Sequence, residues 1–471
     1  MGDIVAYGAY VPYFRLERAV IGAALGSPAG RGTRAVASYD EDTTSMGVEA
    51  ARRCLANAPG ITPDTVVFAT TAPAYLDKTN ATAIHAALGL PESAAAYDMV
   101  GSVRSGWGAL RFGYRAQTPT LVVLSDIRTG LPGGGDERDG GDGAAAFLFG
   151  GSAADGAGLA TVAGGSSSTR EFLDRWRSPG DDFSRLWEER FAEAAYVPLA
   201  EAAITEALKA AALTADAIDH LIVTGLQGRT CKRVAAGVGV RAEAVVDDLA
   251  TSIGNTGAAH AGMLLASVLD RATPGQLIAV VLLADGADVV LLRTTDAHIP
   301  AHTTVAEQIK AGRADLSYAS FLTWRGLLHR EPPRRPDPDP PAAPVSLRHD
   351  HWKFGFVASR CENCGTRHLP PSRVCVKCQA VDQMAPERLA DVRGTIVTFT
   401  VDRLAFTLSP PVVAAVVDFD GGGRLQCELT DVDPDMVSIG GRVEMTFRRL
   451  FTATNGVHNY FWKARPLQGG E

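Results

Sequence analysis

The chain has 471 residues, of which 46% are hydrophobic, and its 45 Lys and Arg against 53 Asp and Glu give a formal net charge of −8. At roughly 100–200 residues per domain, this length predicts two to four structural units with an ample core. The mildly acidic balance disfavours a nucleic-acid binder, which normally carries a basic patch. The most apolar stretch, at 277–284, is far shorter than the ~20 residues that a membrane-spanning helix needs. The N-terminal MGDIVAYGAY lacks the basic n-region of a secretory signal, so we expect a cytoplasmic protein that contacts neither membrane nor nucleic acid.

Strand and helix signals alternate through the first 330 residues. Apolar runs and the amphipathic patterns between them predict strands at 64–71, 120–126, 220–225 and 277–284 and helices at 43–58, 199–213 and 257–270. Such alternation is typical of an α/β body with a parallel or mixed sheet covered by helices. Two of the strands are followed by D-G-A and a second apolar run, at 142–149 and at 285–292, which favours a duplicated α/β half.

A proline-rich segment separates this body from a C-terminal tail. The sequence EPPRRPDPDPPAAP at 331–344 has seven prolines, which fix φ and donate no backbone N–H, so we expect a semi-rigid linker over 331–345. The tail contains short β-rich segments between Gly-rich turns, at 394–404, 411–419, 424–432 and 442–451. Short strands at this spacing predict a small β-barrel.

Four of the seven cysteines lie together in the motif C-E-N-C-(10 residues)-C-V-K-C, as Cys361, Cys364, Cys375 and Cys378. This clustering indicates metal binding in a reducing compartment rather than a disulfide framework. Two such pairs can place four thiolates tetrahedrally around Zn²⁺ at about 2.3 Å, and a site with four protein ligands is structural. An iron site of the rubredoxin type and a redox dithiol pair are the alternatives.

Several motifs of the body resemble the hydroxymethylglutaryl-CoA synthase branch of the thiolase superfamily, especially its archaeal type. They include YDMVGSVRSGWGAL at 97–110, GGDGAAAFLFG at 140–150, SIGNTGAAHAGMLLASVLD at 252–270 and YASFLTWRG at 318–326. The tail resembles the zinc-ribbon and OB-fold acyl-CoA domain that accompanies thiolases and synthases, here fused to the body.

This resemblance implies a fold class and a domain organisation. It implies an α/β thiolase-like body of five αβαβα layers at 1–330, with halves near 1–165 and 195–295, then the linker at 331–345, a rubredoxin-like zinc ribbon at 346–390 and an OB-fold barrel at 391–471. It further implies a homodimer, acyl-CoA thioesters as substrates and a role in lipid metabolism.

The resemblance also locates the family's catalytic positions, and three of the four differ in this chain. The cysteine that takes up the acyl group lies five residues after an aspartate matched by Asp98, which places Val103 at its position. The glutamate base falls on Thr71 and the histidine falls on Thr224. The asparagine is kept as Asn255. In this register an acyl-cysteine intermediate is excluded at this site, because valine cannot be acylated.

Other polar residues near these positions are candidates for the remaining chemistry. A carboxylate in an apolar pocket has a raised pKa and can act as general acid or base, which fits Asp285, although Asp142 holds the matching place in the first half and Asp285 can equally close a turn. Tyr75 either donates a hydrogen bond to an enolate or packs in the core or a dimer interface. Asn255 and Thr224 either contribute to an oxyanion hole or stabilise a turn.

Basic and hydroxyl side chains are the candidates for substrate binding. Ser102 and Arg104 flank Val103, and Arg104 either binds a CoA phosphate or substrate carboxylate or forms a surface salt bridge. Lys232 and Arg233 near a helix start are weaker candidates for CoA phosphates.

Two functions of different classes follow. The first is an enzyme, an acyltransferase or aldolase-type lyase that makes or breaks carbon–carbon bonds of CoA thioesters by aldol, retro-aldol or Claisen chemistry without a cysteine. The alternative is a non-catalytic scaffold or channelling subunit for a partner thiolase.

Overall fold

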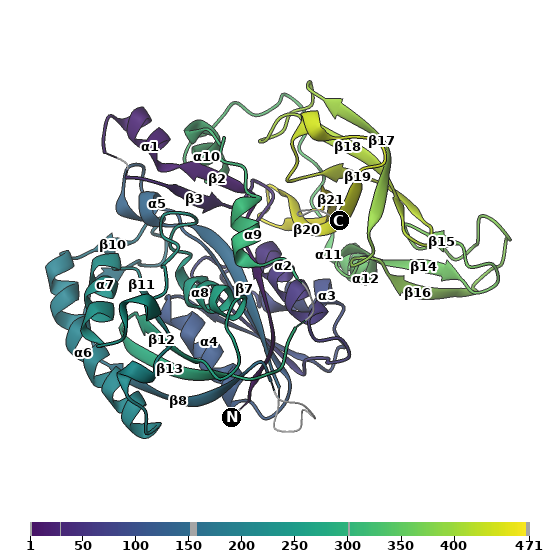
Figure 1. Ribbon diagram of the computed structural model, residues 1–471. Helices are drawn as coiled ribbons and strands as arrows, with labels where there is room; N and C mark the ends of the chain where they lie inside the picture. Colours follow the sequence, from purple (N-terminus) through teal and green to yellow (C-terminus); the bar gives the residue numbers. More distant parts are fainter. Residues whose placement is uncertain (1, 29, 151–157, 300–301, 468–471) are drawn as a thin grey trace. The chain divides into compact units, whose positions relative to one another are not determined.

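The computed structural model describes residues 2–28, 30–150, 158–299 and 302–467 (Figure 1). The described chain divides into two compact units. Unit 1 consists of Met1–Ala37, Glu49–Thr82 and Pro91–Tyr318, and unit 2 consists of Ser38–Val48, Ala83–Leu90 and Ala319–Glu471. No helix among the described residues combines the length and the apolarity that crossing a membrane requires.

Unit 1 is built on a nine-stranded mixed sheet. In order across the sheet its strands are β11 (His220–Gly225), β12 (Leu277–Leu283), β13 (Gly286–Thr294), β8 (Ala160–Thr169), β1 (Ile4–Tyr10), β7 (Asp142–Phe149), β6 (Thr120–Ile127), β4 (Thr65–Thr70) and β5 (Ala95–Val100). Short strands outside it are β2 (Phe14–Glu17), β3 (Thr33–Val36), β9 (Arg175–Trp176) and β10 (Arg185–Leu186). The helices up to residue 310 are α1 (Arg18–Leu25), α2 (Thr43–Ala56), α3 (Ala81–Leu88), α4 (Arg104–Arg115), α5 (Gly135–Asp139), α6 (Glu189–Ala210), α7 (Gly228–Gly237), α8 (His260–Leu269) and α9 (Val305–Lys310).

The two halves of this sheet repeat one arrangement, which confirms the predicted duplication. β4 runs parallel to β6, which pairs antiparallel with β7, and β11 runs parallel to β12, which pairs antiparallel with β13. Asp142 opens β7 and Asp285 directly precedes β13, so the repeated D-G-A lies at matching turns. β1 and β8 join the halves through the pair Ile4 and Ala160.

Helices α4 and α8 form the central layer between the two halves of the sheet. Their apolar residues share one core with the inward faces of β6, β7, β12 and β13. The approach is close, because a side chain at Gly106 of α4 would collide with the carbonyl oxygen of Ala258. On the outer faces, α6 and α7 cover β11–β13, and α2 covers β1, where a Cβ on Gly8 would lie 2.5 Å from the carbonyl oxygen of Ala50. These are the predicted five αβαβα layers.

Helix α6 begins ten residues before the predicted start at 199. Proline in a helix interior removes a backbone hydrogen bond, so the sequence pattern predicts a helix only after Pro198. In the structure Pro198 lies inside α6, and the preceding turns bury Ala192 and Tyr196 in the outer core of the second half. Tertiary burial therefore outweighs the local cost of the proline.

Unit 2 contains a small ribbon and a closed barrel. The ribbon is a three-stranded sheet of β15 (Arg367–His368), β14 (Val357–Cys361) and β16 (Met384–Arg388). The barrel follows the order β17 (Gly394–Asp402), β18 (Val412–Phe419), β19 (Arg424–Leu429), β21 (His458–Pro466) and β20 (Arg442–Thr452). Helices α10 (Tyr318–Trp324), α11 (Ala343–Arg348) and α12 (Asp350–Lys353) precede them. The predicted barrel has four strands, and β21 is the fifth that closes it by pairing with β19 and β20.

A cluster of ionic side chains is buried in unit 2. Arg448 on β20 pairs with Asp431 and, at 2.6 Å, with Glu41, while Lys463 on β21 lies 3.0 Å from Asp40. Burial by itself raises the pKa of Asp40, but the charges of Lys463 and Arg448 outweigh it and hold the pKa at about 2. Buried ion pairs thus anchor the segment Ser38–Val48 to the barrel strands of its unit.

Candidate functional site

A pocket of about 900 Å³ opens in unit 1 at the carboxyl ends of its parallel strands. Ligands of α/β sheets bind in such crevices because loops and helix starts converge there. Residues following β4, β5, β6, β11 and β12 line the pocket together with the segment after β8 and one side chain of α6. Those used below are Thr71, Ser102, Val103, Arg128, Asp174, Arg175, Arg177, Asp182, Tyr196 and Asp285.

Val103 lies at the strand-to-helix turn between β5 and α4. The turn passes through Gly101, which has a φ of +119°. Glycine adopts this value without strain, whereas residues with a side chain do not. Val103 is the residue directly before α4, and its side chain lines the pocket while it packs into the central core. An isopropyl group at this place offers no atom that can accept an acyl group.

Thr71 follows β4 and presents its hydroxyl to a buried carboxylate. Thr71 Oγ1 lies 2.8 and 2.9 Å from the two carboxylate oxygens of Asp126, and Arg128 Nη1 donates to Thr71 Oγ1 at 3.1 Å. The backbone N–H of Ala258 also donates to Asp126, at 2.9 Å. Burial raises the pKa of Asp126, and the charge of Arg128 and these hydrogen bonds oppose the rise.

Asp285 lies in the tight turn between β12 and β13, with a φ of +46°. Its backbone N–H donates to Tyr196 Oη at 3.1 Å, and its carbonyl oxygen accepts from Arg104 Nη1 at 2.6 Å. Within the described residues its carboxylate has no hydrogen-bond partner, and it lines the pocket. The Asp285 residue is exposed, so it is only partly desolvated by the pocket walls; this partial desolvation and the nearby charge of Asp174 raise its pKa, while Arg104 opposes the rise.

The matching residue of the first half, Asp142, has a different environment. Its carboxylate is fully buried and accepts hydrogen bonds from the backbone N–H groups of Ala37, at 2.7 Å, and Arg128, at 3.0 Å. It also pairs with Arg34 at 3.3 Å. Asp142 therefore closes a turn, whereas the carboxylate of Asp285 is left to face the pocket.

Of the two residues flanking Val103, Ser102 lines the pocket and Arg104 does not. Arg104 Nε pairs with Asp288 at 2.8 Å and its Nη2 donates to Thr169 Oγ1 at 2.7 Å. Together with the bond to the carbonyl oxygen of Asp285, these contacts use each nitrogen of the guanidinium. Arg104 thus forms a salt bridge that links α4 to β8 and β13, and its binding of a CoA phosphate or substrate carboxylate stays a prediction.

The structure places the remaining predicted catalytic residues near the pocket but not among its lining residues. Asn255 donates from its side-chain amide to the carbonyl oxygen of Gly225 and accepts from the N–H of Gly257, both at 2.9 Å. Thr224 is buried within β11. The backbone N–H of Tyr75 donates to the side chain of Asn80 at 2.9 Å.

Lys232 and Arg233 lie on α7, away from this pocket. Arg233 Nε pairs with Glu193 at 3.0 Å and lines a second, surface pocket of about 540 Å³ between α6 and α7, together with Arg190 and Arg229. The side chain of Lys232 is exposed. The structure therefore does not bring these two residues to the predicted catalytic positions.

Sequence reasoning missed the charged groups that surround Thr71. Asp126 lies near the end of β6 and Arg128 directly follows the strand. The aspartate that ends the otherwise apolar TLVVLSD is the sequence signal that could have identified this strand end. Arg175 forms a two-point ion pair with Asp136 at 2.5 and 2.7 Å, and Arg177 donates to the carbonyl oxygen of Thr71 at 2.6 Å. Arg175 opens the short strand β9 and Arg177 follows it. The stretch REFLDRWRSPG at 170–180 resembles the family, but its sequence gives no sign that these arginines lie beside Thr71.

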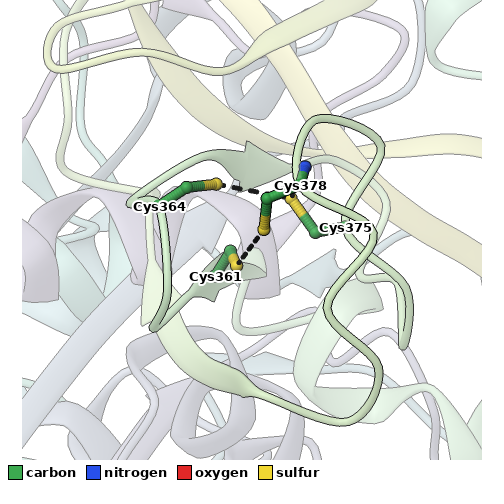
Figure 2. A group of neighbouring side chains, drawn as sticks. All are labelled: Cys361, Cys364, Cys375 and Cys378. Carbon is green, nitrogen blue, oxygen red and sulfur yellow. Dashed lines mark hydrogen bonds between the residues drawn. The ribbon is translucent and has the colours of Figure 1, made fainter.

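The four clustered cysteines form a single site in the ribbon, as Figure 2 shows. Each pair is held by the same turn, because the N–H of Gly365 donates to the carbonyl oxygen of Cys361 at 2.8 Å and the N–H of Gln379 donates to that of Cys375 at 2.9 Å. Gly365 and Gln379 both have positive φ. The sequence-predicted set Cys361, Cys364, Cys375 and Cys378 is thus brought together.

The spacing of the sulfurs fits a tetrahedral zinc ion. Zn–S bonds of about 2.3 Å give sulfur–sulfur edges of about 3.8 Å. Cys361 Sγ lies 3.6 Å from Cys378 Sγ, Cys364 Sγ lies 3.5 Å from Cys375 Sγ, and all four lie within 4.8 Å of one another. The hydroxyl of Thr366 helps lower the pKa of the Cys364 thiol to about 6, which favours the thiolate that a metal binds.

Comparison with known protein families identifies both parts of the tail. The model for the ChsH2 rubredoxin-like zinc ribbon domain matches residues 355–384, and the model for the ChsH2 C-terminal OB-fold domain matches residues 387–448. A DUF35 domain-containing scaffold protein of Methanocaldococcus jannaschii is 31% identical over 127 residues, which cover 26% of this chain and 89% of the relative.

The body is similar to synthases. A hydroxymethylglutaryl-CoA synthase of Aeropyrum pernix is 32% identical over 351 residues, which cover 69% of this chain and 94% of the relative. Among solved structures, an HMG-CoA synthase complexed with CoA has a TM-score of 0.56 at 18% identity and covers 68% of this chain and 89% of its own. The 3-oxoacyl-(acyl carrier protein) synthase III of Pseudomonas aeruginosa has a TM-score of 0.56 at 21% identity, covering 64% and 99%.

Proposed function

This chain belongs to the hydroxymethylglutaryl-CoA synthase family, and from that membership we propose that it makes or breaks a carbon–carbon bond of an acyl-CoA thioester without an acyl-enzyme. The observation that supports the proposal is that Val103, which the family register places at the acyl-acceptor position, and Asp285, a carboxylate with a raised pKa, line the same pocket. An aldol or retro-aldol reaction needs an acid, a base and stabilisation of an enolate, but no covalent intermediate.

The reaction in the cleavage direction defines the role of Asp285. The substrate is a 3-hydroxyacyl-CoA, whose hydroxyl loses its proton as the bond between the α and β carbons breaks. The electron pair of that bond passes to the α carbon as a thioester enolate, and the other fragment leaves as a ketone or aldehyde. Asp285 donates the proton that converts the enolate to the acyl-CoA product, and in the condensation direction it removes that proton. A raised pKa suits both roles.

Cleavage of 3-hydroxybutyryl-CoA and of 3-hydroxy-3-methylglutaryl-CoA by the full chain tests this function. We expect acetyl-CoA as a product of at least one of them, and we expect Asp285→Asn to lower kcat/KM at least 100-fold. Asp182→Asn is the matched control, because it removes a second carboxylate of the same pocket, and it should change kcat/KM less than about threefold. Absence of acetyl-CoA with both thioesters, or full activity of Asp285→Asn, contradicts the proposal.

The tail and the edge of the sheet complete the proposed assembly. In this proposal, zinc held by the four clustered cysteines stabilises the ribbon of unit 2. β5 ends the sheet with Tyr97 and Val100 exposed at 57% and 46%. Exposed edge strands with apolar side chains favour pairing with another chain, which supports a homodimer formed along β5.

The alternative is a scaffold or channelling subunit for a partner thiolase. Its support is the similarity of the tail to a protein described as a DUF35 domain-containing scaffold. Under this alternative the purified protein has no turnover of its own, and a thiolase expressed with it co-purifies and gains activity. Turnover by the isolated chain that depends on Asp285 excludes this alternative as the sole function.

A further inference from the structure

The cleavage reaction needs a second proton-handling group besides Asp285. The acid that protonates the α carbon cannot also remove the proton of the β-hydroxyl in the same step, and the position of the family's glutamate base holds Thr71. A threonine hydroxyl alone is a very weak base. The structure, however, places a buried carboxylate directly behind it, since both oxygens of Asp126 lie within 2.9 Å of Thr71 Oγ1.

Resting on the proposed function, we propose that Thr71 and Asp126 form a proton relay that replaces the missing glutamate base. The substrate hydroxyl donates to Thr71 Oγ1, and its proton moves to that oxygen as the proton of Thr71 moves to a carboxylate oxygen of Asp126. The O–H bond of the substrate breaks, the threonine hydroxyl is regenerated, and Asp126 ends as a neutral carboxylic acid. Asp285 supplies the proton for the enolate, so the two aspartates exchange protonation states over one cleavage event.

The hydrogen-bond geometry at Thr71 supports this direction of transfer. Its single proton points to Asp126, and one acceptor site receives Arg128 Nη1 at 3.1 Å, which leaves the second acceptor site for a hydroxyl donor in the pocket. Of the two residues in the relay, only Thr71 lines the pocket, because the carboxylate of Asp126 is completely buried behind it. The guanidinium of Arg128 also stabilises negative charge on the threonine oxygen while the protons are in transit.

The surroundings of Asp126 hold its carboxylate in a fixed orientation. The N–H groups of Thr71 and Ala258 donate to it at 3.1 and 2.9 Å. Gly257 has a φ of +54°, and a side chain there would collide with Asp126 Oδ2, so only glycine lets this loop approach the carboxylate. Burial raises the pKa of Asp126, which makes it a stronger base than an exposed aspartate.

A hydroxyl-specific variant series tests the relay. Thr71→Val removes the hydroxyl at constant shape, and we expect it to lower kcat for cleavage of the 3-hydroxyacyl-CoA probes at least 100-fold with little change in KM. Thr71→Ser restores the hydroxyl and should recover activity to within about tenfold of the wild type. Thr70→Val is the matched control, because Thr70 contacts the same carboxylate at 3.4 Å but does not line the pocket.

A second readout separates the relay from a structural role. Exchange of the α protons of acetyl-CoA with D₂O requires Asp285 and not the relay, so Thr71→Val should keep this exchange within about threefold of the wild type. The pH profile of cleavage should lose its acidic limb in Asp126→Asn, since the base that must be deprotonated is gone. The charged group that faces Asp126 is Arg128, and Arg128 in turn lies close to Asp136, Arg175 and Arg177.

The outcomes distinguish the relay from the function on which it rests. Wild-type cleavage together with full activity of Thr71→Val overturns the relay and leaves the proposed function standing. Loss of both cleavage and exchange in Thr71→Val assigns the residue a structural role and likewise overturns the relay. Absence of both reactions in the wild type overturns the proposed function itself.

Discussion

Replacing Asp40 with asparagine tests how much the buried ion pairs stabilise unit 2. The carboxylate is fully buried, its Oδ2 lies 3.0 Å from Lys463 Nζ, and Thr430 Oγ1 donates to it at 3.1 Å. Its pKa falls from 3.8 to about 2 in the folded chain. Since one pKa unit corresponds to about 1.4 kcal/mol, folding favours the ionised form by about 2 kcal/mol. Asp40→Asn keeps the shape and removes the charge, so we expect the free energy of unfolding to fall by about 2–3 kcal/mol at pH 7.

The effect has a defined pH dependence. The pKa of Asp40 is lower in the folded than in the unfolded chain, so its contribution is fully present above pH about 4 and is lost as the pH falls toward 2. The difference between wild type and Asp40→Asn should therefore shrink to about half at pH 3. Urea unfolding followed by tryptophan fluorescence, to which Trp462 in the barrel core contributes, measures this difference.

Asp435→Asn provides the control for this prediction, because its side chain is 87% exposed and its only ion pair is with Arg403 at 3.8 Å among the described residues. It should change the free energy of unfolding by less than about 0.5 kcal/mol. Equal stability of Asp40→Asn and wild type at pH 7, or a difference that stays constant down to pH 3, would refute the account of the buried cluster.

Three further predictions concern the metal, the sheet edge and the pocket. Metal analysis of the full chain should find zinc, and iron in place of zinc contradicts this assignment. Cys378→Ser should abolish zinc binding and raise protease sensitivity within 355–384, because the metal site then lacks its fourth ligand. Tyr97→Lys should convert a dimer to a monomer in light-scattering measurements, and an unchanged mass argues against pairing along β5. Cleavage by the wild type should fall as the pH rises through the raised pKa of Asp285, since the acid must hold its proton, and a rate that stays constant into the alkaline range contradicts that role.

The elements that the sequence predicted well are those encoded by local patterns. Uninterrupted apolar runs such as 277–284 gave buried strands, and the repeated D-G-A gave the matching turns of the two halves. The spacing of Cys361, Cys364, Cys375 and Cys378 was sufficient to identify one metal site, because the ligands of each pair are three residues apart. In these cases the neighbours that decide the structure are close in the sequence.

Other elements lacked a local signal because distant residues stabilise them. β8 has the sequence ATVAGGSSST, which is poor in β-branched and aromatic residues, yet it pairs along its length with β13. Its Gly165 is required by close approach, since a Cβ there would lie 2.7 Å from the carbonyl oxygen of Val289. In the same way, Tyr460 donates to Asp42 at 2.6 Å although the two are 418 residues apart.

The candidate site was predicted only in part. The family register identified Val103 and Thr71, and both line the pocket together with Asp285. It could not identify Asp126 and Arg128, because their importance lies in their contacts with Thr71 rather than in any motif of their own. The match to the family's motifs shows which catalytic residue is replaced. Only the packing around the replaced position shows which neighbouring groups are available for the same chemistry.

Incubation of the full chain with acetyl-CoA in D₂O, followed by mass spectrometry of both the thioester and the intact protein, tests the central claim of cysteine-independent chemistry most directly. The pocket built around Val103 and Asp285 predicts that deuterium enters the acetyl group while the protein keeps the mass of the unmodified chain. An acetyl adduct on the protein, or acetyl-CoA recovered without deuterium, would contradict it.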